Sequence, residues 1–82
     1  FELEGGLAAA EAFMQNLAIP ICAPSLGGVE SLITRPATTS HAGMPREDRE
    51  RAGISDALIR LSVGLESTAD LIEDLAGALA RV

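Results

Sequence analysis

The chain has 82 residues, of which twelve are acidic and six basic, and its formal net charge is −6. This length fits one small domain or a part of a larger protein. The acidic excess argues against binding to nucleic acid, whose phosphates require clustered cations. No apolar run approaches the roughly 20 residues of a membrane span, so we expect no membrane partner either.

The first part of the chain predicts a strand, a helix and a second strand. Residues 1–4 alternate apolar and acidic side chains, which indicates a short half-buried strand that ends at a Gly–Gly pair. Residues 7–17 place apolar side chains on one helical face: Leu7, Ala10, Phe13, Met14 and Leu17. The run AIPICA fits a short buried strand, so the single cysteine, Cys22, is expected to be buried and inert.

The middle of the chain predicts a turn, a strand and a short helix. PSLGG is typical of a turn, and residues 29–34 alternate as a strand that ends before Arg35 and Pro36. The polar segment that follows is predicted to be a loop. Residues 45–53 carry mixed charges and almost no apolar face, so we expect a short exposed helix that begins at Pro45.

The last part predicts a strand over residues 56–65 and a helix from about Ser67 to the end of the chain. The helix has a capping hydroxyl at its start and one apolar stripe, which we expect to be buried: Leu71, Ile72, Leu75 and Leu79. The order of the elements predicts an α/β fold, an α+β sandwich in which helices cover one face of a small, mostly antiparallel sheet.

The strand over residues 56–65 has two different faces. One face is apolar and is expected to pack on helices: Ile59, Leu61, Val63 and Leu65. The other carries Arg60, Ser62 and Gly64, a combination typical of a strand that borders a pocket. A guanidinium in this position would be stabilised by a bidentate carboxylate. The spacing alone favours an ion pair with an acid of this chain, and a ligand carboxylate is the alternative.

Two other segments contain candidate chemistry. The glycines that follow Ser25 would let backbone N–H groups contact an anion, although an ordinary turn is favoured because the lysine of a phosphate-binding loop is absent. His41 is the only histidine, and we expect it to be a hydrogen-bonded structural residue. No second histidine or nearby cysteine accompanies it, so no metal site is predicted.

Three segments in this order resemble one enzyme family: SLGGVESLITRPATTSHAG, GISDALIRLSVGLES and DLIEDLAGAL. They closely resemble the C-terminal region of the Cys/Met-metabolism enzymes that depend on pyridoxal 5′-phosphate. These are the trans-sulfuration enzymes: cystathionine γ-synthase, cystathionine γ-lyase, methionine γ-lyase and the homoserine-ester sulfhydrylases. The resemblance covers nearly the whole chain. It implies fold type I, with residues 1–82 as the small C-terminal domain and a larger cofactor-binding domain outside this chain.

The resemblance also implies roles for four residues. Arg60 would bind the α-carboxylate of the substrate, and Ser25 would lie beside that carboxylate. Ser40 would line the substrate pocket, at a position where threonine is usual in the family. Pro24 stands where many cystathionine-handling members have glutamate, so it would influence specificity. The family's cofactor-binding lysine has no counterpart, because the chain contains no lysine, and we therefore expect no catalytic or cofactor-binding residue in it.

The implied function is γ-elimination or γ-replacement on a sulfur amino acid, carried out once this segment is joined to the rest of its enzyme chain. Such an enzyme would use pyridoxal 5′-phosphate, act on a small-molecule amino acid and form a homotetramer of two dimers in the cytoplasm. The alternative is a free-standing module of the same fold that binds an amino acid or a partner without catalysis. The missing lysine is what this alternative predicts.

Overall fold

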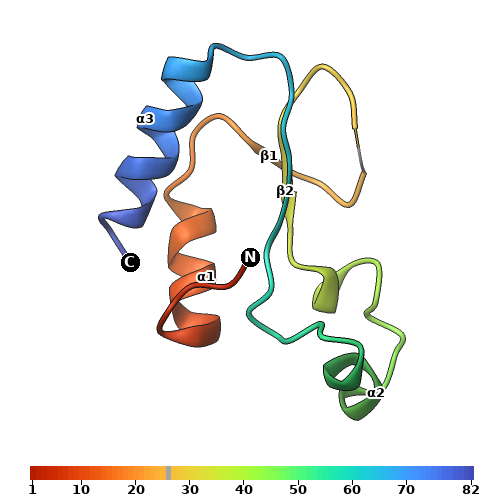
Figure 1. Ribbon diagram of the computed structural model, residues 1–82. Coiled ribbons are helices and arrows are strands. Elements are labelled where there is room, and N and C mark those ends of the chain that lie inside the picture. Colours follow the sequence, from red (N-terminus) through yellow and green to blue (C-terminus); the bar gives the residue numbers. More distant parts are fainter. Residues whose placement is uncertain (26) are drawn as a thin grey trace.

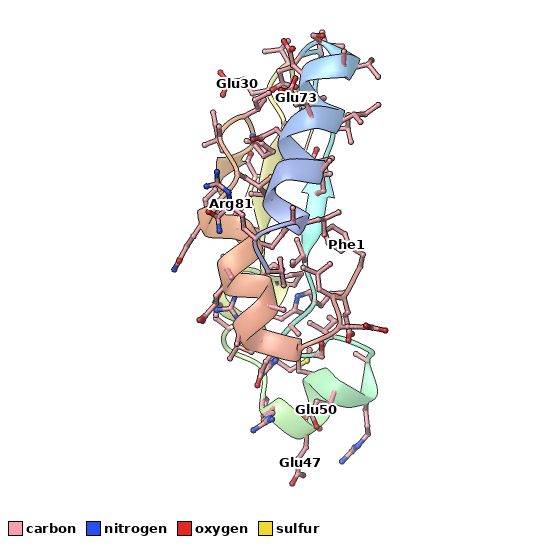
Figure 2. All side chains as sticks on the ribbon, turned by 90° about the vertical axis from the view of Figure 1, so that its left-hand side faces the viewer. Phe1, Glu30, Glu47, Glu50, Glu73 and Arg81 are labelled. Carbon is pink, nitrogen blue, oxygen red and sulfur yellow. The ribbon has the colours of Figure 1, made fainter. Side chains whose placement is uncertain are left out.

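The computed structural model describes residues 1–25 and 27–82, so Leu26 of the predicted PSLGG turn lies outside the described residues (Figure 1). Helices α1 (Gly6–Gln15) and α3 (Thr68–Leu79) pack on each other and cover one face of a small sheet. Figure 2, turned by 90°, shows both helices in front of the strands. The predicted layer of helices on one face of the sheet is therefore present.

The sheet has three strands in the order β1-β2-β3: β1 (Ile21–Cys22), β2 (Leu32–Thr34) and β3 (Arg60–Ser62). β2 and β3 are antiparallel, with Ile33 opposite Leu61, but β1 and β2 are parallel. The expectation of a mostly antiparallel sheet is wrong, and the sheet is mixed. The cause is the connection between β1 and β2, which crosses the sheet on the side opposite the helices and returns the chain in its original direction (Figure 1).

The first predicted strand does not form. The chain turns at Glu4 and Gly5 and enters α1 directly. Phe1 nevertheless exchanges two backbone hydrogen bonds with Ile59, of 2.9 and 2.8 Å, as a residue pair of an antiparallel ladder does. Only this one pair remains of the expected strand.

Phe13 of α1, Ile33 of β2 and Ile59 next to β3 are the largest apolar side chains of the core, and all three are fully buried. The ring of Phe1 meets the ring of Phe13 edge to face, with 5.8 Å between the centroids. Ala10 of α1 and Ala78 of α3 are buried in the same cluster. Their small side chains allow the two helices to pack closely.

Parts of the predicted apolar faces are exposed. On α3, Leu71 is buried and Leu75 packs on the core, but Ile72 is 61% exposed and Leu79 is also exposed, while Ala78 takes the buried position. The expected stripe is thus wrong at two of its four positions. On the strand, Val63 and Leu65 are exposed as well, because β3 ends at Ser62 and the chain leaves the sheet there.

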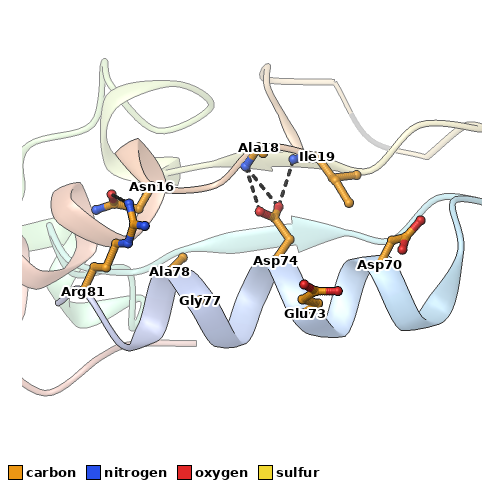
Figure 3. A pocket seen from close by; sticks show the side chains of 9 residues that line it. All are labelled: Asn16, Ala18, Ile19, Asp70, Glu73, Asp74, Gly77, Ala78 and Arg81. Carbon is orange, nitrogen blue, oxygen red and sulfur yellow. Dashed lines mark hydrogen bonds between the residues drawn. The ribbon is translucent and has the colours of Figure 1, made fainter.

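Edge position explains the exposure of Cys22. The prediction of a buried thiol is wrong, since β1 is an edge strand and both of its side chains are exposed. Asp74 of α3 holds the segment that enters β1, where its carboxylate accepts hydrogen bonds of 2.8 to 3.0 Å from the backbone N–H groups of Ala18 and Ile19 (Figure 3). β1 is therefore fixed to the helix layer by a polar contact.

Helix α2 (Arg46–Arg51) and a single 3₁₀ turn (Pro36–Thr38) lie beyond one end of the sheet (Figure 1). α2 is mostly exposed, as predicted, except for Arg49, which is buried and donates to Asp56 at 2.7 Å. This bond lowers the pKa of the Asp56 carboxyl. Within the described residues, no helix combines the length and apolarity required to cross a membrane.

Candidate functional site

Arg60 lies at the start of β3, half-buried, with its side chain directed to the connection between β1 and β2. Its Nη2 donates hydrogen bonds of 2.9 Å to the backbone carbonyls of Pro24 and Ser25. Across the described part of the chain, Arg60 belongs to no ion pair. The internal ion pair that the spacing alone favoured is therefore wrong.

The guanidinium of Arg60 is oriented by neutral groups and keeps donors for a ligand. Both recorded hydrogen bonds use Nη2, and within the described residues Nε and Nη1 have no hydrogen-bond acceptor. A planar guanidinium binds a carboxylate through two parallel N–H groups, so these two nitrogens can accept a bidentate partner. Most other arginines of the chain are already paired with acids: Arg35, Arg46, Arg49 and Arg51.

Residues 24, 25 and 27–31, here called the 24–31 loop, lie on the sheet face opposite the helices (Figure 1). Gly27 and Gly28 have φ values of 79° and 136°, a region of backbone conformation that favours glycine. The N–H of Gly27 donates to Ser62 Oγ at 3.0 Å. This amide is therefore used within the protein, which supports the interpretation of the glycine pair as a turn element and not as an anion site.

Ser25 and Pro24 are brought to Arg60 through their backbone. Their carbonyls contact the guanidinium, whereas both side chains are exposed. Ser25 lines a shallow open hollow together with Gly27 and Gly28. The loop thus places these two predicted site residues beside Arg60, with the Ser25 hydroxyl accessible.

Ser40 lies in the same pocket as Arg60 and comes from another element, the loop that follows the 3₁₀ turn. Ser40, His41 and Arg60 line one open pocket of about 450 Å³, whose other walls are apolar: Phe1, Pro36, Ile54, Leu58, Ile59 and Leu61. Ser40 Oγ and His41 Nδ1 are 2.9 Å apart. His41 is hydrogen-bonded, as predicted, and it lies in the wall of the same pocket.

One residue that contacts this loop, Glu66, was not identified from the sequence. Glu66 accepts hydrogen bonds from the backbone and side chain of Ser31, the last residue of the 24–31 loop. Position 66 continues the alternation of Arg60, Ser62 and Gly64, and this period is the feature by which it could have been recognised. Over the described ranges, 1–25 and 27–82, no group of three or more metal-ligating side chains is gathered.

Comparison with known proteins gives a consistent family. Residues 1–80 match the model described as Cys/Met metabolism PLP-dependent enzyme. A cystathionine gamma-lyase of Bos taurus is 56% identical over 79 residues, which are 96% of this chain and 20% of that protein. An L-methionine gamma-lyase of Fusobacterium nucleatum is 46% identical over 82 residues, which are 100% of this chain and 21% of that protein.

A solved structure also superposes closely. It is a cystathionine gamma synthase of Xanthomonas oryzae pv. oryzae in complex with cystathionine, with a TM-score of 0.93 and 57% identity over 99% of this chain and 21% of that chain. The same enzyme has been solved in complex with aminoacrylate and cysteine. The present chain spans about a fifth of the length of the curated relatives that it matches.

Proposed function

The chain belongs to the family of Cys/Met-metabolism enzymes that depend on pyridoxal 5′-phosphate, and we propose that it is the small C-terminal domain of such an enzyme. In this role it supplies the site that holds the α-carboxylate of the amino-acid substrate. The proposal includes the expected substrate class, a sulfur amino acid that undergoes γ-elimination or γ-replacement. It also includes assembly as a homotetramer in the cytoplasm.

The observation that carries the proposal is the state of Arg60. Its guanidinium is half-buried and fixed by two carbonyls, yet it belongs to no ion pair in the described part of the chain. Carbonyl contacts orient the guanidinium but do not neutralise its positive charge. An incoming carboxylate can therefore form an ion pair with a guanidinium that is already held in position. Ser25 and Ser40 supply hydroxyls from two different loops beside this carboxylate.

The cofactor itself fits the remainder of the enzyme better than this segment. Pyridoxal 5′-phosphate, when bound, withdraws the electrons of the bond that breaks at Cα. The chain has no lysine to form the Schiff base, so in this proposal that lysine belongs to the remainder of the enzyme. The part played by Arg60 is orientation: a two-point grip on the carboxylate fixes the direction of the bonds at Cα.

A second candidate is a free-standing amino-acid-binding module without catalysis. It is favoured by the absence of lysine from the chain, and it retains the same carboxylate site on Arg60. The two candidates differ in one observation, which is whether the coding sequence continues upstream of Phe1 into a lysine-containing domain.

The test is Arg60→Ala in the full-length protein that contains this chain. Cystathionine, methionine and an acylated homoserine with cysteine are assayed, with 2-oxobutyrate and cystathionine as products. Loss of two hydrogen bonds to a charged group, worth together about 3 kcal/mol, should raise KM about 100-fold and leave the cofactor absorbance in place. Arg51→Ala removes an equal charge from an exposed site on α2 and is the control. An unchanged KM in Arg60→Ala would refute the carboxylate site.

A further inference from the structure

Glu66 lies between the end of β3 and the start of α3, and its carboxylate takes both donors of one buried residue. Its Oε2 accepts the backbone N–H of Ser31 at 2.6 Å, and its Oε1 accepts the Ser31 hydroxyl at 2.7 Å. Ser31 is 0% exposed and ends the 24–31 loop. One carboxylate therefore satisfies two polar groups that would otherwise be buried without partners.

This contact belongs to a small hydrogen-bond network, in which the Ser31 hydroxyl is both a donor and an acceptor. The Ser31 hydroxyl donates to Glu66 and accepts the N–H of Gly64 at 2.9 Å. The N–H of Leu65 donates to the carbonyl of Val29 at 2.8 Å. These bonds anchor the far end of the loop to the chain that follows β3.

The near end of the loop is held from the same side of the strand. Arg60 contacts the carbonyls of Pro24 and Ser25, and Ser62 accepts the N–H of Gly27. The side-chain contacts come from Arg60, Ser62 and Glu66, and Gly64 contacts the loop through its backbone N–H; we call these four residues the loop-facing row. Arg60 and Ser62 share one face of β3, and Gly64 and Glu66 follow after the strand ends, so the row meets the loop at both of its ends.

We propose that Glu66 is a positioning residue for the carboxylate site. By holding Ser31 it fixes the far end of the 24–31 loop, and through the loop it fixes the carbonyls that orient Arg60. The inference rests on the proposed function of Arg60, but the contact between Glu66 and Ser31 is independent of it. Glu66 itself is not expected to touch the substrate.

The contact as observed uses both oxygens of a carboxylate. A glutamine at position 66 has one oxygen and one NH2 group in their place, so when its oxygen accepts the N–H of Ser31, its NH2 group meets the Ser31 hydroxyl. The hydroxyl can then no longer donate to that position, and the charge-assisted bond that it makes to Glu66 is lost. Ser31→Ala removes the hydroxyl bond to Glu66 and the acceptor of the Gly64 N–H, and it leaves the backbone N–H of Ser31 bonded to Glu66. The two variants therefore weaken the same anchor from its two sides.

The kinetic test compares Glu66→Gln with Glu30→Gln in the full-length holoenzyme. Glu30 is the neighbour of Ser31, is exposed (Figure 2), and has no polar side-chain partner among the described residues, so it controls for the lost charge. Glu66→Gln should raise KM about tenfold, as expected for a lost hydrogen bond to a charged group, with kcat and cofactor absorbance nearly unchanged. Ser31→Ala should also raise KM, and the increase in the double variant should be smaller than the product of the two single increases, because both substitutions remove the same bond between the hydroxyl and Glu66. Equal KM values in Glu66→Gln and Glu30→Gln would overturn the proposal.

Hydrogen exchange separates the anchor from the function of the site. Backbone amides of residues 27–31 should exchange faster in Glu66→Gln than in Glu30→Gln, and equal rates would show that Glu66 does not hold the loop. If Arg60→Ala raises KM and Glu66→Gln does not, the positioning role alone fails. If Arg60→Ala leaves KM unchanged, the proposed function fails, whatever the exchange rates show. Should Glu66→Gln not fold, Ser31→Ala retains the carboxylate and carries the same two measurements.

Discussion

Replacing Gly64 by alanine would place a methyl group against the backbone of the 24–31 loop. A Cβ at this position would lie 2.5 Å from the carbonyl carbon of Glu30, 2.5 Å from the carbonyl oxygen of Val29 and 2.6 Å from the nitrogen of Ser31. These are backbone atoms, which cannot rotate away as the end of a long side chain can. The loop would have to withdraw by about 1 Å to reach the roughly 3.5 Å of an ordinary contact.

A displacement of this size acts on both stability and binding. Overpacking of a fitted interior costs about 1–3 kcal/mol. The same shift would stretch the hydrogen bonds of Gly64 and Leu65 to the loop and move the carbonyls that orient Arg60. Misplacement of a positioning group by about 1 Å can cost about 100-fold in catalytic efficiency. We therefore expect Gly64→Ala to lower both the melting temperature and kcat/KM of the full-length protein.

Gly77→Ala is the matched control for this substitution. Gly77 lies in α3, and a Cβ there would meet nothing within 4 Å. Alanine in a helix interior is favoured over glycine by about 0.5–1 kcal/mol, so the control should raise the melting temperature slightly. The two substitutions add the same methyl group and should have opposite effects, which thermal unfolding and steady-state kinetics would show. A Gly64→Ala protein as stable and active as Gly77→Ala would refute the close approach of loop and strand.

Two further predictions concern specificity and pH. Pro24→Glu should raise the ratio of kcat/KM for cystathionine to that for methionine about fivefold, because the new carboxylate can form an exposed ion pair with the distal ammonium of cystathionine. A change of the same size in Pro24→Gln would contradict a charge effect. The pKa of the Glu66 carboxyl is lowered in the folded protein, mainly by the backbone N–H of Ser31 and then by the Ser31 hydroxyl. The contact therefore stabilises the folded state fully above the ordinary pKa of 4.5, and this contribution is lost as the pH falls through the lower pKa of the folded protein. The difference in urea midpoint between the wild type and Glu66→Gln should therefore shrink on going from about pH 7 to about pH 3.5, and a constant difference would argue against the contact.

The elements with strong local patterns were predicted from the sequence, and their arrangement in the sheet was not. The apolar spacing of α1 and α3 is a property of each helix alone, so both helices were found close to their observed bounds. The parallel pairing of β1 with β2 depends on the path of the chain between them, which no local pattern encodes. The exposure of Cys22 has the same origin, because the sequence AIPICA does not indicate that β1 lies at an edge.

The sequence predicted that Arg60 belongs to the site, but it did not predict the groups that Arg60 contacts. Alternation along the strand placed Arg60 on the polar face, and the structure agrees. Its partners are the carbonyls of Pro24 and Ser25, and because every residue has a carbonyl, no residue type marks them in a sequence. Glu66 differs in this respect. It continues the two-residue period of Arg60, Ser62 and Gly64, so an alternating row that includes a glycine should be followed to its next charged residue before its chemistry is assigned.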